Sequence, residues 1–395
     1  MGYRTYTCPI ARTCGGCEWL AVPYPIQLER KQAFVQELLG GPAEKDGAVV
    51  ETIRGIDDPV AYRLKAATPF SPGKGGRVRS GFYAMGTHHI VACESCLVED
   101  PRARRVLNAV ARAAEHHHVS AYDEDRGKGV LRHAVVRFGY ASDEVLLVIV
   151  TNGPDLPHLE AFMTELREQC PEVTSVVQNV NDRRTNAILG WTNKTLYGPG
   201  CMHDRLLGCT FEIGPTSFYQ TNPAQTEVLY QLAIDGAELL PGQRLLDAYC
   251  GTGTIGICAA SLVEGLRVIG VEQVGDAVAR AGRNARANGV GERCRFLRSD
   301  ATEYMDATVR ADRPDDRFDV VVMDPPRAGS TPKFLAGVSR LGPSRIAYVS
   351  CNVITQARDI TILRDYGYRL ERVTPVDMFP HTKHVESVAI LSRKS

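Results

Sequence analysis

The pattern of apolar and polar positions changes character near residue 244. From there on, short apolar runs alternate with intervals that have room for a helix, which is typical of a parallel sheet joined by crossover helices. The interval 379–386 is too short for a crossover, so the strand after it is expected to run antiparallel. Seven strands are predicted, at 244–250, 267–273, 293–298, 318–324, 345–350, 369–378 and 387–392.

The chain before residue 244 has shorter and less regular elements. Apolar spacing predicts a helix from Tyr24 to Leu39 that ends at Gly40-Gly41. Alternating runs predict an antiparallel sheet, with a helix at 102–115 against it. Its strands are expected at 62–70, 78–85, 88–92, 130–140 and 144–151, followed by a helix at 157–169, strands at 173–181, 185–189 and 210–213, and a helix at 224–239. We therefore expect three consecutive parts: a cysteine segment with a helix (1–50), a β-rich domain (51–214) and an α/β domain (215–395).

Charge and hydropathy restrict the possible partners. The 46 basic and 46 acidic residues give a formal net charge of zero, so a nucleic-acid partner would need a local basic patch. One candidate lies between Val60 and Ser80, which holds five basic residues and no acid: Arg63, Lys65, Lys74, Arg77 and Arg79. With nearby aromatic residues this segment suits phosphates and unstacked bases, and an ordinary solvated surface is the equal alternative. No long apolar run is present, so we expect a cytoplasmic protein without a membrane partner.

Three cysteines stand close together at the start of the chain. Cys8, Cys14 and Cys17 have the spacing C-x5-C-x2-C, and a fourth thiolate could come from Cys93 or Cys96. Both an iron-sulfur cluster and a structural zinc ion take four thiolates, so the spacing leaves both open. Buried free thiols are the third alternative, but three cysteines in ten residues are denser than core packing requires.

A glycine-rich turn follows the first strand of the α/β domain. In DAYCGTGTIG, Gly251, Gly253 and Gly256 have the G-x-G-x-x-G register that lets a backbone approach a nucleotide at the start of a helix. Glu272 ends the next strand, 21 residues after Gly251, where its carboxylate can accept both ribose hydroxyls. Enzymes that use NAD and enzymes that use S-adenosylmethionine (SAM) share this arrangement.

Three further features favour SAM and the outline of a class I methyltransferase. These are the hairpin before the seventh strand, Asp300 after the third strand, and Asp324 in the sequence DPPR after the fourth. The carboxyl ends of parallel strands line one crevice, so Asp247, Glu272, Asp300 and Asp324 are expected to converge there.

The fifth strand ends at a candidate nucleophile. Cys351, in YVSCN, lies at the same edge of the sheet, and a helix beginning near Thr355 is expected to favour its thiolate. Uracil C5 becomes nucleophilic only after a thiolate adds to C6, and the reaction then needs a base to remove the C5 proton. Glu386, in the hairpin before the last strand, fits that role. The alternatives are a buried strand-end thiol and a surface carboxylate.

The motifs FYQTN, DAYCGTGTIG, DPPR, SCN and HVESVAIL occur in the order in which they occur in RNA 5-methyluridine (uracil-C5) methyltransferases. The chain resembles that family over nearly its whole length, and the cysteines resemble the iron-sulfur segment of its ribosomal-RNA members. The cysteine segment begins at Cys8, so the chain most resembles the 23S rRNA subgroup that lacks an N-terminal barrel. The resemblance implies a [4Fe-4S] cluster on Cys8, Cys14, Cys17 and Cys96, SAM contacts from Gln220, Tyr249, Glu272 and Asp324, Cys351 as nucleophile and Glu386 as base.

We therefore expect SAM-dependent methylation of a loop uridine in 23S rRNA by a monomeric enzyme. Gly251, Gly253 and Asp300 are added to the expected SAM site from their positions in the sequence. Two alternatives remain: the same chemistry on transfer RNA, and an iron-sulfur oxidoreductase that uses NAD, for which the glycine-rich loop is the support.

Overall fold

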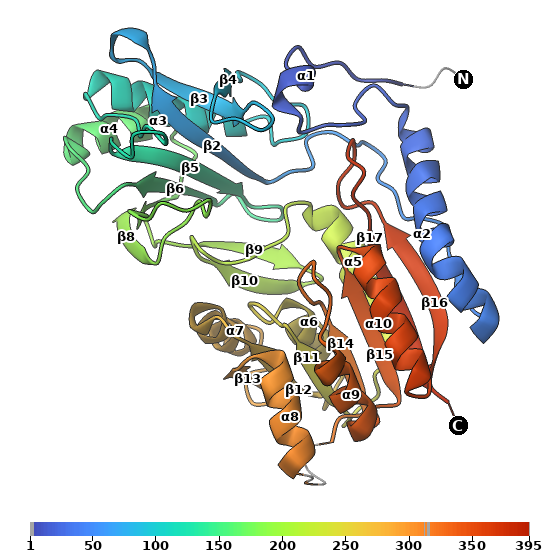
Figure 1. The fold of residues 1–395 in the computed structure, drawn as a ribbon. Helices are drawn as coiled ribbons and strands as arrows, with labels where there is room; N and C mark the ends of the chain where they lie inside the picture. The colour runs from blue at the N-terminus through green and yellow to red at the C-terminus, as the bar shows by residue number, and fades with distance from the viewer. Residues whose placement is uncertain (1–3, 312, 314–316, 395) are drawn as a thin grey trace. The chain divides into compact units, whose positions relative to one another are not determined.

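The structure, a computed structural model, describes residues 4–311, 313 and 317–394 (Figure 1). The chain forms two compact units. The first unit contains the segments up to residue 22, 58–205 and 212–222, and the second contains 23–57, 206–211 and the chain from 223 onward. The grouping differs from three consecutive domains, because the helix expected to accompany the cysteine segment belongs to the second unit.

The second unit is built on one mixed sheet. Its strand order is β1-β16-β17-β15-β14-β11-β12-β13, and β17 is antiparallel to both of its neighbours while the other pairs are parallel. The predicted parallel sheet with an antiparallel last strand is therefore confirmed. The two-residue β1 is an eighth strand that the sequence did not indicate. The strands are β1 (Val49–Val50), β11 (Arg244–Ala248), β12 (Arg267–Glu272), β13 (Cys294–Arg298), β14 (Val320–Met323), β15 (Arg345–Ser350), β16 (Tyr368–Val376) and β17 (Glu386–Arg393).

In the part of the chain that the structure describes, seven helices accompany this sheet, and the first is longer than predicted. Helix α2 passes through Gly40, Gly41 and Pro42 and ends at Asp46, where Gly47 adopts a left-handed conformation with φ 71°. Val35, Leu39 and Ala43 continue its apolar stripe and are buried in the core of the unit. The two glycines cost the helix about 1 kcal/mol each and Pro42 costs about 3 kcal/mol, and the burial of this stripe offsets that cost, so the helix does not end at the glycine pair. The helices are α2 (Tyr24–Asp46), α5 (Pro223–Ala237), α6 (Thr254–Leu262), α7 (Gly275–Ala287), α8 (Ala301–Ala311), α9 (Pro332–Leu341) and α10 (Val353–Asp365).

The first unit contains a seven-stranded sheet in the order β4-β3-β2-β5-β6-β7-β8, and the β9-β10 ribbon is divided between the two units, with 206–211 in the second. The sheet is antiparallel as predicted, except that β6 and β7 are parallel. A strand was expected at 185–189, but the strand that pairs with β7 lies at 192–197. The strands are β2 (Lys65–Pro72), β3 (Val78–Tyr83), β4 (Ile90–Ala92), β5 (Leu131–Phe138), β6 (Val145–Thr151), β7 (Ser175–Val180), β8 (Thr192–Tyr197), β9 (Met202–Leu206) and β10 (Cys209–Ile213), and the helices are α1 (Ala11–Cys14), α3 (Ala103–His116) and α4 (Leu159–Gln169).

Helices α3 and α4 are amphipathic and bury their apolar faces in the core of the first unit. Ten of the fourteen residues of α3 are buried, so this helix is a central part of that core. In the described residues, no helix is long and apolar enough to cross a bilayer.

Candidate functional site

The glycine-rich turn between β11 and α6 is held from inside the sheet. The Asp247 carboxylate is buried and accepts a hydrogen bond from the Gly256 amide at 2.9 Å. A Cβ on Gly256 would lie 2.8 Å from that carboxylate and from Val268, so the helix can start this close to the sheet only with glycine. Burial raises the pKa of Asp247 to about 7. Asp247 therefore braces the turn.

The residues around this turn leave space for a ligand. Glu272 accepts a hydrogen bond from the Gly251 amide at 3.2 Å and another from the Val274 amide at 2.8 Å. A Cβ on Gly251 would meet no atom within 4 Å, so the turn faces open space. Tyr249 has a positive φ of 63°, and its hydroxyl lies 2.9 Å from Ser330 Oγ. The half-buried Glu272 carboxylate beside an open glycine turn fits the ribose of a bound nucleoside.

Two residues expected at the SAM site are placed differently from Glu272. The Asp300 carboxylate accepts hydrogen bonds from the amides of Thr302 and Glu303 and so holds the first turn of α8. Its side chain caps the helix terminus, and Asp300 is exposed. Gln220 lies in the first unit, whereas Glu272 lies in the second.

Strand pairing brings Cys351 and Glu386 to the same end of two neighbouring strands. Ser350 at the end of β15 pairs with Ser387 of antiparallel β17, Cys351 and Glu386 are the next residues on the two chains, and the charge of Glu386 acts on the Cys351 thiol. Glu386 is 4% exposed. Its burial, and then the charge of Asp324, raise its pKa to about 8. Asp324 follows β14 at the same edge, and burial raises its pKa to about 7.

The surroundings of Cys351 oppose ionisation, contrary to the expectation from the helix terminus. Burial, followed by the charges of Glu386 and Asp324, raises the pKa of Cys351 to about 11, and the Arg327 guanidinium acts in the other direction. Helix α10 does begin at Val353, two residues after the thiol, but its terminal amide groups do not outweigh two nearby carboxylates. In the free protein the thiol is therefore protonated at neutral pH.

The turn that carries Arg327 is fastened to the turn that carries Cys351. Asn352 donates from Nδ2 to the Arg327 carbonyl at 2.9 Å, and its Oδ1 accepts from the Ile354 amide at the start of α10. Thr355 Oγ1 also donates to the Arg327 carbonyl, at 3.3 Å. These bonds fix the DPPR and SCN turns to each other, so the guanidinium and the thiol are presented by one rigid edge.

The N-terminal cysteines come together in the first unit. The pKa of Cys17 is raised to about 12 by burial and then by the charges of Cys96 and Cys14. Cys8 acts in the same direction on both Cys14 and Cys17. Cys93 is buried, and its thiol donates to the Ser95 carbonyl at 3.1 Å, whereas Cys96 is half-buried. Of the five candidate ligands, the four half-buried ones are those that the resemblance assigns to the cluster: Cys8, Cys14, Cys17 and Cys96.

A buried arginine suits an anionic group at these thiols. Arg104 is 2% exposed and pairs with Glu99, and its Nη1 has no hydrogen-bond partner among the described atoms. Its charge acts on both Cys14 and Cys96. An iron-sulfur cluster with four thiolates is anionic and accepts hydrogen bonds, so this set of residues fits it.

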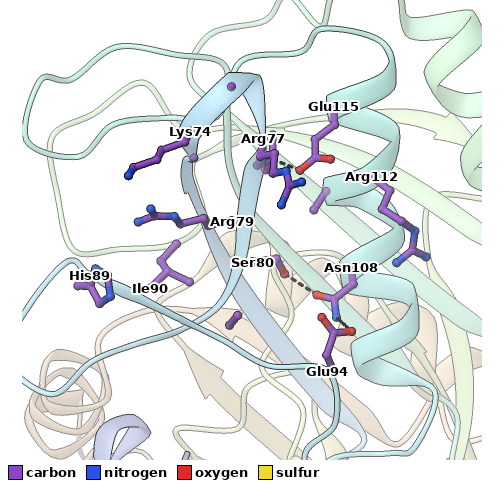
Figure 2. A pocket seen from close by; sticks show the side chains of 15 residues that line it. Lys74, Arg77, Arg79, Ser80, His89, Ile90, Glu94, Asn108, Arg112 and Glu115 are labelled. Atoms are coloured by element: carbon purple, nitrogen blue, oxygen red, sulfur yellow. Dashed lines mark hydrogen bonds between the residues drawn. The ribbon is translucent and has the colours of Figure 1, made fainter.

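The predicted basic face is divided into two places. Lys74, Arg77 and Arg79 are exposed and line an open pocket of ≈ 1090 Å³ between β3, β4 and α3 (Figure 2). Arg63 and Lys65 are not part of it. Lys65 lies on β2 directly opposite Arg137 of β5, on a covered part of the sheet. The sequence suggested one continuous basic face because a sequence does not reveal which side chains of each strand point away from the solvent.

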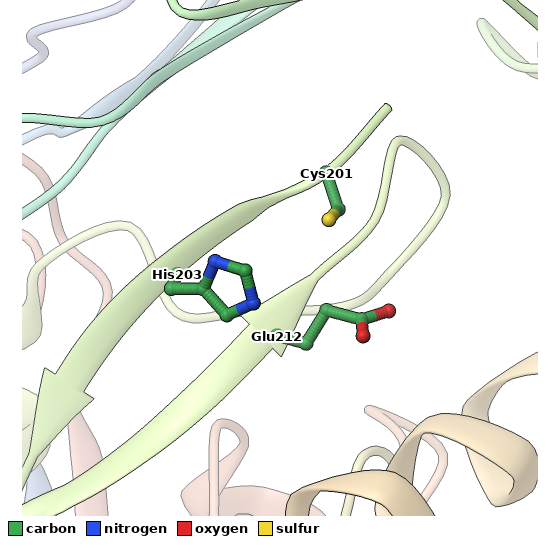
Figure 3. A group of neighbouring side chains, drawn as sticks. All are labelled: Cys201, His203 and Glu212. Atoms are coloured by element: carbon green, nitrogen blue, oxygen red, sulfur yellow. The ribbon is translucent and has the colours of Figure 1, made fainter. Parts of the chain in front are cut away.

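A side-chain group that the sequence analysis missed lies on the β9-β10 ribbon. One possible ligand atom from each of Cys201, His203 and Glu212 lies within 4.8 Å of the others, and together they could hold one metal ion (Figure 3). Their signal in the sequence is a C-x-H pair before a two-residue hairpin turn, Leu207-Gly208, which brings Glu212 back across from His203.

Comparison with known proteins gives one consistent result. Residues 204–394 match the family model described as tRNA (Uracil-5-)-methyltransferase. An uncharacterized RNA methyltransferase of Halalkalibacterium halodurans is 38% identical over 392 residues, covering 98% of this chain and 83% of that protein. One from Staphylococcus aureus is 40% identical over 388 residues, covering 98% of this chain and 84% of that protein.

A solved structure agrees with this result. The crystal structure of the Pyrococcus abyssi tRNA (uracil-54, C5)-methyltransferase in complex with S-adenosyl-L-homocysteine has a TM-score of 0.77 to this structure. It is 28% identical, and the match covers 98% of this chain and 87% of that one. The chain therefore belongs to the RNA uracil-5 methyltransferase family.

Proposed function

We propose that this protein methylates C5 of a loop uridine in 23S ribosomal RNA, with SAM as methyl donor, giving 5-methyluridine. The observation that carries the proposal is the placement of Cys351 and Glu386 together at the carboxyl edge of the sheet, beside the open glycine turn. A thiol and a carboxylic acid at one edge supply the nucleophile and the base that this reaction needs.

The protein's own residues account for the covalent steps. The Cys351 thiol loses its proton to solvent, and the resulting thiolate bonds to C6 of the uracil, which makes C5 electron-rich. Bound SAM supplies an electrophilic methyl group to that carbon. Glu386, in its ionised form, then takes the C5 proton, the C5–C6 double bond re-forms, and the C6–S bond breaks to release Cys351. Arg327 is the nearby positive charge that favours the thiolate before addition.

The remaining residues are assigned by position. The residues proposed to hold SAM are Gln220, Tyr249, Gly251, Gly253, Glu272, Asp300 and Asp324. Cys8, Cys14, Cys17 and Cys96 are proposed to hold a [4Fe-4S] cluster, with buried Arg104 as a compensating charge. The exposed basic pocket of Figure 2 is proposed to bind the RNA backbone around the target loop, where a uridine is unstacked at the least cost.

Transfer RNA is the second candidate substrate. The matching family model and the Pyrococcus abyssi enzyme are both named for transfer RNA. The cysteine set favours ribosomal RNA instead, since it resembles the cluster of the ribosomal-RNA members.

Mapping 5-methyluridine in RNA from cells with and without the gene distinguishes these candidates. We expect one 5-methyluridine to disappear from 23S rRNA and the amount of 5-methyluridine in transfer RNA to stay constant. Loss from transfer RNA alone would support the second candidate. Unchanged 5-methyluridine in both RNAs would contradict the proposed function.

A further inference from the structure

Two cations, one buried and one half-buried, face each other in the first unit. Lys65 of β2 and Arg137 of β5 are register partners on adjacent antiparallel strands, so their side chains lie on the same face of the sheet. Arg137 is 4% exposed, and Lys65 is half-buried. Like charges directly opposite each other destabilise a sheet, and burial increases this cost.

No carboxylate compensates these charges within the described residues. Arg137 donates from Nη2 to the Ser217 carbonyl at 2.5 Å, and its buried Nε has no hydrogen-bond partner. Neither cation forms an ion pair with a described acidic residue. Burial, and then the charges of Arg137 and Arg63, lower the pKa of Lys65 to about 7.

The segment that covers these cations also offers an unpaired hydroxyl. The Thr221 carbonyl accepts a hydrogen bond from the Leu64 amide at 2.8 Å, next to Lys65 in the chain. The buried Thr221 Oγ1 has no hydrogen-bond partner among the described atoms. Two cations and one hydroxyl, all with unused donors, are the recognition elements for an oxyanion.

We propose that Lys65 and Arg137 bind a backbone phosphate of the RNA substrate, with Thr221 as a further donor. This inference rests on the proposed function for the identity of the ligand. A phosphodiester compensates the facing charges, since a buried anion between two cations turns their repulsion into two attractions. The site stores an unfavourable arrangement in the free protein that RNA binding relieves.

The test is the Lys65→Met variant of the full-length, cluster-containing protein. Removing one of the two facing cations is expected to raise the midpoint temperature of thermal unfolding of the free protein. It should also weaken the affinity for a loop oligonucleotide about tenfold. The slope of log affinity against log salt should fall by about 0.7. Inorganic phosphate, compared with chloride at equal ionic strength, should stabilise the wild type and not the variant. Lys194→Met, an exposed lysine of β8, is the matched control and should change none of these quantities.

Each other outcome contradicts the inference. A lower thermal midpoint for Lys65→Met would mean that the lysine is a stabilising structural residue. Unchanged RNA affinity would place the phosphate elsewhere, and weaker SAM binding with unchanged RNA affinity would assign the cations to the SAM carboxylate. Because the phosphate and oligonucleotide measurements need no turnover, they stand even if the proposed methylation of 23S rRNA fails.

A separate observation concerns the Cys201, His203 and Glu212 group. Buried and outward-facing side chains alternate along β9 and β10. Met202 and Ile213 are buried, and the side chains of Cys201, His203 and Glu212 lie on the outer face. The backbone of His203 is held at both ends, because its amide donates to Glu144 at 2.7 Å and its carbonyl accepts from Ser142 at 2.6 Å. The ring Nδ1 lies 3.3 Å from the Glu144 carboxylate, which leaves Nε2 for a ligand.

The geometry points to a zinc site on this ribbon. A thiolate, an imidazole and a carboxylate are a zinc ligand set, and a carboxylate on the second ring nitrogen is the usual support for a metal-binding histidine. Water would complete the four positions. The ion would join the two strands of the ribbon, since Cys201 and His203 lie at β9 and Glu212 lies on β10.

Zinc titration of the full-length protein in competition with a chromophoric chelator tests the site. We expect one zinc ion per chain, and at least tenfold weaker binding in Cys201→Ser and Glu212→Gln, with unchanged iron content. Arg205→Gln, on the same outer face, should bind zinc as the wild type does. No zinc binding by the wild type, or equal binding by Cys201→Ser, would overturn the assignment.

Discussion

Replacing Glu386 by Gln separates the two chemical roles at the edge of the sheet. If Cys351 adds to C6 first and Glu386 only removes the C5 proton afterwards, the variant should methylate its RNA once and then stall. The amide cannot take the proton, so the C6–S bond cannot break. The protein should remain covalently attached to the methylated RNA.

The magnitude follows from the role of the base and from its pKa. Loss of a general base slows proton removal by about 10²- to 10⁴-fold, so release of the adduct should slow by that factor. Formation of the adduct should not slow, because Glu386 is one of the charges that raise the pKa of Cys351. In the wild type, a pKa of about 8 for Glu386 means that the rate of proton removal should rise about tenfold between pH 7 and pH 9.

Denaturing gels and single-turnover methyl transfer measure both expectations. Glu386→Gln with SAM and RNA should give a shifted protein band, and Cys351→Ala should give neither a shifted band nor product. Normal turnover by Glu386→Gln without an adduct would refute the assignment of the base. His384, whose Nδ1 lies 3.4 Å from Arg327 Nη2, would be the next residue to replace.

Three further predictions follow from the described contacts. Arg327→Met should raise the pKa of the Cys351 thiol further, so alkylation of Cys351 by iodoacetamide should shift to higher pH; an unchanged profile would show that the guanidinium does not favour the thiolate. Lys31 and Asp377 form a fully buried ion pair at 2.6 Å, so Lys31→Met should lower the free energy of unfolding in urea by about 3–5 kcal/mol, and adding Asp377→Asn should recover much of that loss; additive losses would argue against the pair. Cys96→Ser should remove the iron that the anaerobically purified wild type contains, about four atoms per chain, and stoichiometric zinc without iron in the wild type would contradict the cluster.

The sequence predicted most of the second unit because its signals were local. The short interval 379–386 was enough to predict an antiparallel β17, and with it Glu386 at the same edge as Cys351. The end of α2 was wrong because the glycine pair was weighed without the tertiary burial of Leu39 and Ala43, which only the folded sheet provides.

Features that depend on strand register could not be predicted in the same way. Lys65 was expected on an exposed face, but its environment is set by Arg137, 72 residues later in the chain. The pKa of Cys351 was expected to follow the helix terminus, whereas burial and then two carboxylates from separate strands raise it. Both errors come from burial and long-range charge interactions that a linear pattern does not contain.

The position of β17 has a consequence for biosynthesis. Of the strands in its sheet it is translated last, yet it lies between β15 and β16, each of which it pairs along most of its length. Until it emerges from the ribosome, the nascent chain has two unpaired edges facing a gap one strand wide, a surface that chaperones recognise and that aggregates readily. Because the same strand begins with Glu386, insertion of the missing strand and maturation of the catalytic edge are a single event. Incomplete chains should therefore form the adduct poorly and be cleared by proteolysis before they can trap RNA.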